Sequence, residues 1–285
     1  MTKLINGKKL AQVKTLRLQR RLKKWQKQHQ TEIVLISLVA DEDKLGQLYT
    51  NLKQKAAQNI GLEFKKISFS LKQPSKTISL IKKACQQKNL KGLIIQKPNQ
   101  STSQKYFKTK KDFQTWWSAL VKKIPPQLDV DGLNPASPVY PATVKAVYSA
   151  LTSILPEKKL AGKRAVIIGS SDILGKPLAL LLRDKGMTVI IFGSSEKKPA
   201  QLCRLADILI GCVGKPNLIT GRMVKPGAIV IDAGMSVINR QAVGDVDFKS
   251  ISRKAAYLTP VPGGIGPLTV VSLLENLFNI LESDS

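Results

Sequence analysis

Hydrophobic and polar positions change their spacing several times in the first third of the chain. The basic stretch 8–29 repeats apolar side chains at near-helical intervals, which predicts an amphipathic helix. The continuous apolar run 32–40 is typical of a buried parallel strand. Expected helices and strands then alternate over 46–60, 62–70, 76–88 and 91–96. This β-α-β-α-β order predicts a parallel sheet.

The alternation stops at residues 97–127, which are polar and basic, and we interpret them as an insertion with one helix near Trp116 and Trp117. It then resumes in the second half. The expected order is helix 142–155, strand 164–169, helix 175–185, strand 188–192, helix 199–205, strands 207–213 and 228–234, and a closing helix 268–282. Two α/β domains with parallel sheets are therefore predicted, the second of them Rossmann-like.

Composition sets limits on location and partners. We find no apolar run of the roughly 18–20 residues that a membrane span needs, and the N-terminus lacks the apolar centre of a secretory signal. We therefore expect a cytoplasmic protein without a membrane partner. Residues 1–128 hold 28 Lys and Arg against 6 Asp and Glu, a net charge of +22 out of +27. That field would attract nucleic acid, but no series of base-stacking aromatics accompanies it, so we expect no specific nucleic-acid partner.

Histidine and cysteine are too sparse for several kinds of catalytic site. The single histidine, His29, lies in a polar stretch, and the three cysteines are widely separated. A zinc site or a Ser-His-Asp triad is therefore not expected, and we predict no metal. Cys212 lies in an apolar run, where a buried core thiol is the simpler interpretation.

One glycine-containing turn indicates dinucleotide binding. An apolar strand leads into Gly169-x-Ser171-x-x-x-Gly175-x-Pro177 and then into a helix. The free N–H groups at such a helix start bind pyrophosphate, and glycines let the backbone come close. The spacing differs from G-x-G-x-x-G by one residue, so a purely structural turn is the alternative.

Four further segments carry candidate chemistry, each with a plain structural alternative. Tyr49 and Lys53 are four residues apart on an expected helix, where the pair either relays protons or is a surface pair. Gln96 ends a strand, and Asp131 opens a tight turn with Gly132. The loop 259–267 brings bare backbone close to a ligand or makes a rigid crossover between domains.

Taken together, these segments closely resemble the bifunctional methylenetetrahydrofolate dehydrogenase/methenyltetrahydrofolate cyclohydrolase (FolD) family, over nearly the whole chain. The most specific segments are IIGSSDILGKPLALLL, ADILIGCVGKP, VKPGAIVIDAG, VGDVDF and TPVPGGIGPLT. The resemblance implies a folate-binding catalytic domain at 1–141 completed by the C-terminal helix 268–285. It also implies an NAD(P)-binding domain at 142–267, with a cleft between the two.

The resemblance also implies roles for individual residues. Asp131 would anchor the pterin, Tyr49 would orient it, and Lys53 would assist proton transfer with its position set by Gln96. Pro262, Gly263 and Gly264 would contact the substrate. The implied cofactor contacts are Gly169, Ser170, Ser171, Ile173, Gly175, Lys176, Pro177, Ser194, Ser195, Val213, Gly214 and Gly234. The implied activity oxidises methylenetetrahydrofolate and hydrolyses the product to 10-formyltetrahydrofolate, a one-carbon donor of the kind that purine biosynthesis uses. A homodimer through residues near 234–243 is also implied.

Several positions depart from the family pattern. Ser170 replaces an Arg, and Glu196 adds an acid after the second strand of the Rossmann-like domain, which weakens the expected site for a 2′-phosphate. We expect NADP as cofactor, with Lys197 and Lys198 as substitutes for the lost Arg, and leave NAD open. Near the folate, Lys97 stands in place of Leu and Gly46 in place of Ser.

Other functions are compatible with the same residues. A FolD-like protein that retains only the cyclohydrolase activity is the main alternative, because the Lys53, Gln96 and Asp131 set is intact while the dinucleotide site differs. A polyanion-binding module and an unrelated Rossmann dehydrogenase are further alternatives. Tight and steeply salt-dependent binding to DNA or RNA would favour the polyanion-binding module, and merely nonspecific affinity at physiological salt would exclude it.

Overall fold

The computed structural model describes residues 1–193, 200–238 and 241–283, and the chain divides into two compact units. The first unit comprises Lys14–Ala142 with Leu273–Ser285. The second unit comprises Met1–Val13 with Thr143–Ser272. Each unit has a parallel sheet of its own, so the predicted two-domain α/β class is confirmed.

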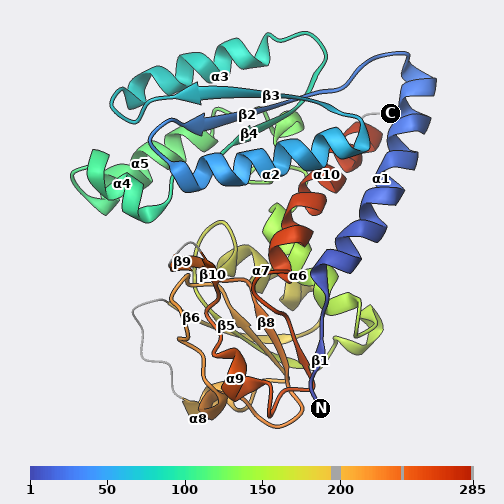
Figure 1. Cartoon of the computed structure of the whole chain (residues 1–285), viewed down its shortest axis with the longest axis vertical. Helices are drawn as coiled ribbons and strands as arrows, with labels where there is room; N and C mark the ends of the chain where they lie inside the picture. The colour runs from blue at the N-terminus through green and yellow to red at the C-terminus, as the bar shows by residue number, and fades with distance from the viewer. Residues whose placement is uncertain (194–199, 239–240, 284–285) are drawn as a thin grey trace. The chain divides into compact units, whose positions relative to one another are not determined.

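The first unit is built on a three-stranded parallel sheet in the order β3-β2-β4. Its strands are β2 (Val34–Ala40), β3 (Glu63–Phe69) and β4 (Leu90–Ile95). All seven residues of β2 are buried because this central strand is covered on both faces, which explains its unbroken apolar run. Figure 1 shows α2 (Lys44–Ile60) on one face and α3 (Thr77–Cys85) on the other. α2 ends at Gly61, whose left-handed backbone (φ 94°) caps the last carbonyls.

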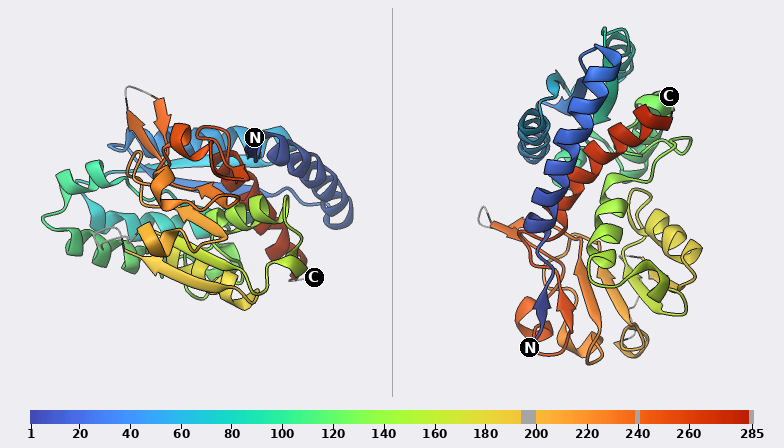
Figure 2. Two further views of the ribbon diagram at one scale, coloured as in Figure 1. Left: turned by 90° about the horizontal axis from the view of Figure 1, so that it is seen from below. Right: turned by 90° about the vertical axis from the view of Figure 1, so that its right-hand side faces the viewer.

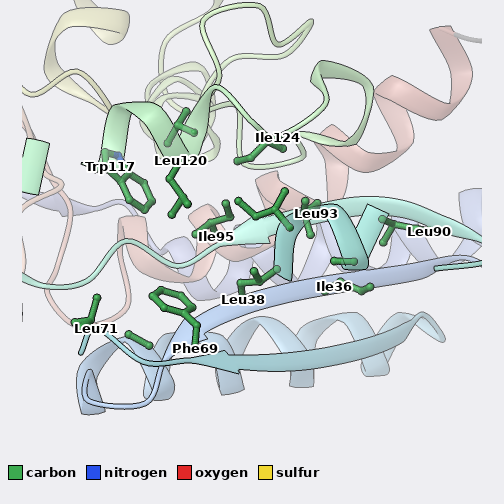
Figure 3. Packing of buried hydrophobic residues seen from close by; sticks show 14 of the residues in the cluster. Ile36, Leu38, Phe69, Leu71, Leu90, Leu93, Ile95, Trp117, Leu120 and Ile124 are labelled. Atoms are coloured by element: carbon green, nitrogen blue, oxygen red, sulfur yellow. The ribbon is translucent and has the colours of Figure 1, made fainter. Parts of the chain in front are cut away.

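The inserted segment packs on the face of this sheet that α3 covers. Trp117, Leu120 and Ile124 join side chains of all three strands in one buried cluster, as Figure 3 shows. The segment holds two helices, α4 (Gln100–Tyr106) and α5 (Lys110–Val121), where the sequence predicted one. The sequence did not predict α4, because its seven residues are almost entirely polar and show no apolar periodicity. Its start signal is Asn99, whose side chain accepts a hydrogen bond from the N–H of Thr102.

Parts of two long helices, from Lys14 onward in one and from Leu273 onward in the other, complete the first unit. α1 (Gly7–His29) and α10 (Ile265–Ser283) run side by side in Figures 1 and 2. Lys14 pairs with Glu275 at 2.8 Å, and Arg21 pairs with Glu282 at 2.7 Å. Part of the high positive charge of α1 is therefore balanced by acids on α10.

The second unit has a six-stranded, entirely parallel sheet in the order β1-β11-β8-β7-β5-β6. Its strands are β1 (Lys3–Leu4), β5 (Arg164–Ile168), β6 (Thr188–Phe192), β7 (Ile208–Gly211), β8 (Ile229–Asp232) and β11 (Tyr257–Leu258). Its helices are α6 (Ala142–Thr152), α7 (Gly175–Asp184), α8 (Ala200–Cys203) and α9 (Phe248–Ile251). Short 3₁₀ turns occur in the first unit at Pro74–Lys76 and Pro126–Leu128, and in the second unit at Glu157–Lys159 and Gly221–Met223. β9 (Ser236–Ile238) and β10 (Gln241–Val243) form a separate antiparallel pair.

The first 13 residues, Met1–Val13, pack with the second unit. The sequence predicts a folate-binding domain over 1–141, and the packing of these residues is a separate feature of the fold. The reason for this packing is β1, which pairs with β11 through N–H donation from Lys3 to Ala256 O and from Ile5 to Leu258 O. These two strands have two residues each, too few to show a period-2 pattern. The boundary at the other end falls within α10, after Ser272, and not before it.

One helix in the described part of the chain, α10, has the length and apolar composition that a membrane crossing requires. The sequence analysis did not anticipate a stretch of this kind. However, 61% of the apolar window is buried inside the protein. Burial in the core accounts for its apolar side chains.

Candidate functional site

Three of the predicted catalytic residues meet in the first unit. Lys53 lies on the face of α2 that packs against the protein, and only 8% of it is exposed. Its Nζ lies 3.2 Å from Oε1 of Gln96 and 3.1 Å from Oδ2 of Asp131. The ammonium group is therefore held between an amide oxygen and a carboxylate.

Regular structure fixes two of these side chains. The buried residues of α2 recur every three or four positions, namely Gly46, Thr50, Lys53, Ala57 and Ile60. This spacing keeps Lys53 on the packed face. Gln96 follows β4 directly, and its N–H donates to Leu38 O on the neighbouring strand at 2.8 Å. The amide therefore lies at the carboxyl end of the sheet, where open parallel sheets bind ligands.

A tight turn positions Asp131. The next residue, Gly132, has a φ of 68°, and a Cβ there would lie 2.7 Å from the carbonyl of Tyr140. Only glycine fits both conditions. Asn276 of α10 holds the same region, because its Nδ2 donates to Val130 O and to Tyr140 O at 3.0 Å each.

Tyr49 lies one turn before Lys53 on α2 and is half-buried. Burial raises the pKa of its phenol, so the side chain stays neutral at physiological pH. A neutral phenol can donate a hydrogen bond and can offer a ring face to a planar ligand.

Sequence reasoning missed two buried acids next to these residues. Asp43, at the start of α2, is 1% exposed and accepts a hydrogen bond from the N–H of Asn99 at 3.0 Å. Asp129 is fully buried; its Oδ2 accepts from the N–H of Asn134 at 2.6 Å, and its Oδ1 has no hydrogen-bond partner. Burial raises the pKa of Asp129 to about 6, against the opposing effect of that hydrogen bond. The sequence singled out Asp131 by the glycine that follows it, and no local pattern indicated that Asp129 would be buried.

The predicted dinucleotide turn lies in the second unit, between β5 and α7. Gly169 has a φ of 124°, and a Cβ there would lie 2.6 Å from Cys212 O. A Cβ on Gly175 would lie 1.8 Å from Gly169 O, so both glycines are required by close backbone packing. Ser170, Ser171 and Ile173 lie in the turn between these glycines, while Lys176 and Pro177 begin α7.

Two neighbouring strands contribute the rest of this edge. β5 pairs with β6 on one side and with β7 on the other, so the chain reverses its direction of winding at β5. Such a switch point leaves a crevice at the carboxyl ends of the strands, where dinucleotides bind. Val213 and Gly214 follow β7, and Gly234 follows β8.

Two buried aspartates order these loops. Asp245 accepts from the N–H groups of Val213 and Lys215, and Asp232 accepts from the N–H groups of Gly234 and Asp245. Burial raises the pKa of Asp232 to about 6. Cys212 lies beside them; burial, with the nearby Asp245 carboxylate, raises the pKa of its thiol to about 12. That thiol is therefore a poor nucleophile. The residue is only partly buried and is not the fully buried core thiol that its apolar run predicted.

The basic side chain at the dinucleotide turn already has an acidic partner. Lys176 Nζ lies 2.8 Å from Asp172 Oδ1, and both groups are exposed. Ser194 and Ser195, the other predicted cofactor contacts, lie outside the described residues, as do Glu196, Lys197 and Lys198.

The predicted substrate loop belongs to the second unit, unlike Lys53, Gln96 and Asp131. Pro262 is exposed and follows a cis peptide bond, and Gly264 is buried. Gly263 O accepts from the N–H of Lys8 at 3.1 Å, and a Cβ on Gly7 would lie 1.8 Å from Gly264 O. Direct backbone contact with the start of α1 therefore requires glycine at this end of α1.

Comparisons with known proteins agree over the whole chain. The family model for the catalytic domain of tetrahydrofolate dehydrogenase/cyclohydrolase matches residues 5–131, and the model for its NAD(P)-binding domain matches residues 141–285. The chain is 38% identical over 251 residues to the bifunctional protein FolD of Caldanaerobacter subterraneus, and the match covers 85% of each protein.

Solved structures show the same relationship. The bifunctional FolD enzyme of Campylobacter jejuni has a TM-score of 0.88 at 29% identity and covers 100% of both chains. The FolD enzyme of Trypanosoma brucei, complexed with NADP cofactor and inhibitor, has a TM-score of 0.88 at 27% identity over 99% of this chain and 98% of that one. The chain therefore belongs to the tetrahydrofolate dehydrogenase/cyclohydrolase (FolD) family.

Proposed function

We propose that this protein oxidises 5,10-methylenetetrahydrofolate to 5,10-methenyltetrahydrofolate with NAD(P) and hydrolyses the product to 10-formyltetrahydrofolate. The observation that carries the proposal is the buried Lys53 ammonium group, held 3.2 Å from the Gln96 amide oxygen and 3.1 Å from the Asp131 carboxylate. Membership of a family whose relatives are bifunctional supports both half-reactions.

Lys53 supplies the proton transfers of the hydrolysis. Water adds to the cationic methenyl carbon and loses one proton to Lys53 in its neutral amine form. The bond from that carbon to N5 then breaks as N5 takes this proton from the resulting ammonium group, and the carbinol hydroxyl releases its own proton to solvent as the formyl C=O forms. Gln96 and Asp131 hold the amine in place, and Asp131 has the acceptor geometry to bind N–H groups of a pterin.

The dinucleotide supplies the hydride acceptor for the oxidation. The described residues that would hold it are those of the β5–α7 turn and the ends of β7 and β8, where the start of α7 offers N–H groups to a pyrophosphate. NADP is the cofactor that we propose, since Lys197 and Lys198 follow Glu196 in the sequence and add net positive charge for a 2′-phosphate.

Replacement of Lys53 by alanine tests the first step. Lys53→Ala should lower the kcat for hydrolysis of methenyltetrahydrofolate by at least about 100-fold, the usual contribution of general acid–base catalysis. The control is Lys55→Ala, which removes an exposed lysine of the same helix. Near-normal turnover by a folded Lys53→Ala variant would refute the proposal.

Oxidation is measured separately, as reduced cofactor formed from methylenetetrahydrofolate with NADP or with NAD. A higher kcat/KM with NADP is expected. Higher kcat/KM with NAD would overturn the cofactor assignment, and hydrolysis without oxidation by either cofactor would establish the cyclohydrolase-only alternative.

We also propose that the protein is a homodimer that associates through β9 and β10. Val237 and Ile238 are apolar and nearly half exposed (47% and 46%), which is the pattern expected of a surface that another subunit covers. Val237→Glu should convert a dimer to a monomer in light scattering after size exclusion. A wild-type monomer at micromolar concentration would contradict the assignment.

A further inference from the structure

The four residues that follow β4 connect the candidate site to the inserted helices. Gln96 contacts Lys53, as described above. The next residue, Lys97, places its Nζ 5.9 Å from the ring centre of Phe113 and 5.5 Å from that of Trp117, both on α5. These are distances at which an ammonium group is attracted to an aromatic face. Pro98, between Lys97 and Asn99, is buried.

Asn99 links the same segment to the start of α2. Its N–H donates to Oδ2 of Asp43 at 3.0 Å, and its side-chain Nδ2 donates to Oδ1 of the same carboxylate. Its Oδ1 meanwhile caps α4 by accepting from the N–H of Thr102 at 2.9 Å. Asp43 stands at the N-cap position of α2 yet makes no side-chain cap bond there. The carboxylate is therefore committed to Asn99.

Gly46 shows how closely this contact lies to the catalytic amide. A Cβ at position 46 would lie 2.5 Å from Oδ2 of Asp43 and 3.2 Å from Cγ of Gln96. The Asp43 carboxylate and the Gln96 side chain thus both pack against the same bare backbone position on α2. Any side chain there would displace one or both of them.

We propose that Asp43 and Asn99 are positioning residues for the Gln96–Lys53 pair. The backbone at Gln96 is held by the hydrogen bond from its own N–H to Leu38 O. Three residues further along the chain, the bidentate contact between Asn99 and Asp43 holds the same segment in place. The second contact ties the end of β4 to the start of α2, the two elements that carry Gln96 and Lys53. It therefore sets the separation of the amide oxygen from the amine.

This inference rests on the proposed role of Lys53. It is tested by exchanging the side chains of Asp43 and Asn99. Asn99→Asp retains the α4 cap but puts two carboxylates face to face. We expect the kcat for hydrolysis to fall about 10- to 100-fold, the scale of a misplacement of about 1 Å, with the Kd for NADP unchanged. The double variant Asp43→Asn/Asn99→Asp restores an amide–carboxylate pair with the partners reversed. It should recover kcat to within about threefold of wild type.

Two further variants keep the test decisive. Asn59→Asp makes the same charge change at an exposed position of α2 and should leave kcat unchanged. Gly46→Ala should lower kcat although alanine favours a helix over glycine, because the added Cβ displaces Asp43 and Gln96. If Asn99→Asp does not fold, the kcat of Gly46→Ala by itself tests the positioning role.

The outcomes separate this inference from the proposed function. Normal kcat in folded Asn99→Asp and Gly46→Ala, with Lys53→Ala inactive, would overturn the positioning role alone. An exchange variant that regains the wild-type melting temperature but not kcat would overturn it too. An active Lys53→Ala variant would instead remove the role of Lys53 itself.

Discussion

Two aspartates separated by one residue have opposite environments in this protein. Asp131 is paired with the Lys53 ammonium group, whereas Asp129 is fully buried with one carboxylate oxygen lacking a hydrogen bond. A buried ionised group without full compensation destabilises the folded state. Burial accordingly raises the pKa of Asp129 from an ordinary value of 3.8 to about 6. The same turn thus holds one carboxylate that suits ligand binding and one that strains the fold at neutral pH.

Asp129→Asn should therefore stabilise the protein at pH 7.5. The folded-state pKa lies above the unfolded one, so the folded state retains the proton as the unfolded state loses it. The contribution of protonated Asp129 to the free energy of unfolding is fully present below about pH 4 and is lost as the pH rises through about 6. Asparagine can still accept from the N–H of Asn134, and it has no charge to bury. A gain on the order of 1–3 kcal/mol is expected at pH 7.5, with little gain near pH 4.

Urea unfolding of wild type and variant at both pH values measures this difference. Glu63→Gln, which neutralises an exposed carboxylate of the same unit, serves as the control. A loss of stability at pH 7.5 would show that the Asp129 carboxylate is a net stabilising group.

At the scale of elements, two short connections are determined by backbone contacts. The β5–α7 turn brings Gly175 against the carbonyl of Gly169, and the segment after β4 is held to α2 and α5 through Lys97 and Asn99. The first contact belongs to the proposed cofactor site and the second to the proposed catalytic site. In both cases, the functional groups lie at strand ends whose position depends on a neighbouring helix.

Gly175→Ala is the sharpest test of the first connection. Its Cβ would lie 1.8 Å from Gly169 O, a backbone atom that cannot rotate away, so β5 and α7 must separate. We expect the Kd for NADP to increase at least about 10-fold, measured by calorimetric titration. Leu180→Ala, at an exposed position of the same helix, is the control. NADP affinity within twofold of wild type would show that the close packing is not needed for binding.

At the scale of the molecule, the two compact units are not continuous in sequence. Met1–Val13 belongs to the second unit although the chain then enters the first, and α10 passes from the second unit into the first. The high positive charge is distributed along this path, and two of the lysines and arginines of α1 are neutralised by Glu275 and Glu282. We therefore expect polyanions to bind weakly and with a steep salt dependence.

Ile5→Ala tests the assignment of the N-terminus. Ile5 is 2% exposed and follows β1, so its truncation should cost about 2–5 kcal/mol, as for other large-to-small core changes. Hydrogen exchange should then show faster opening of β11 and β8 in the second unit, with β2–β4 of the first unit unchanged. Loss of protection confined to the first unit would contradict the division.

The sequence by itself determined most elements and their class. Continuous apolar runs identified β2, β5 and β8, and near-helical spacing identified α1 and α2. Glycine identified the C-terminal end of α2 and the start of α7. These are local signals, since they depend on the burial of a strand or on the allowed φ of a single residue. The candidate residues Tyr49, Lys53, Gln96 and Asp131 came from such local patterns and from the family resemblance.

Tertiary structure alone decided which of these side chains meet and what supports them. The pairing of β1 with β11 joins residues about 250 positions apart, and no short-range pattern in either strand encodes it. The contact of Asn99 with Asp43 likewise depends on how β4 and α2 pack, and so does the different burial of Asp129 and Asp131. Burial and hydrogen bonding depend on the residues that surround a side chain in space. For this reason, only the folded structure shows which of these acids is paired and which is buried without full compensation.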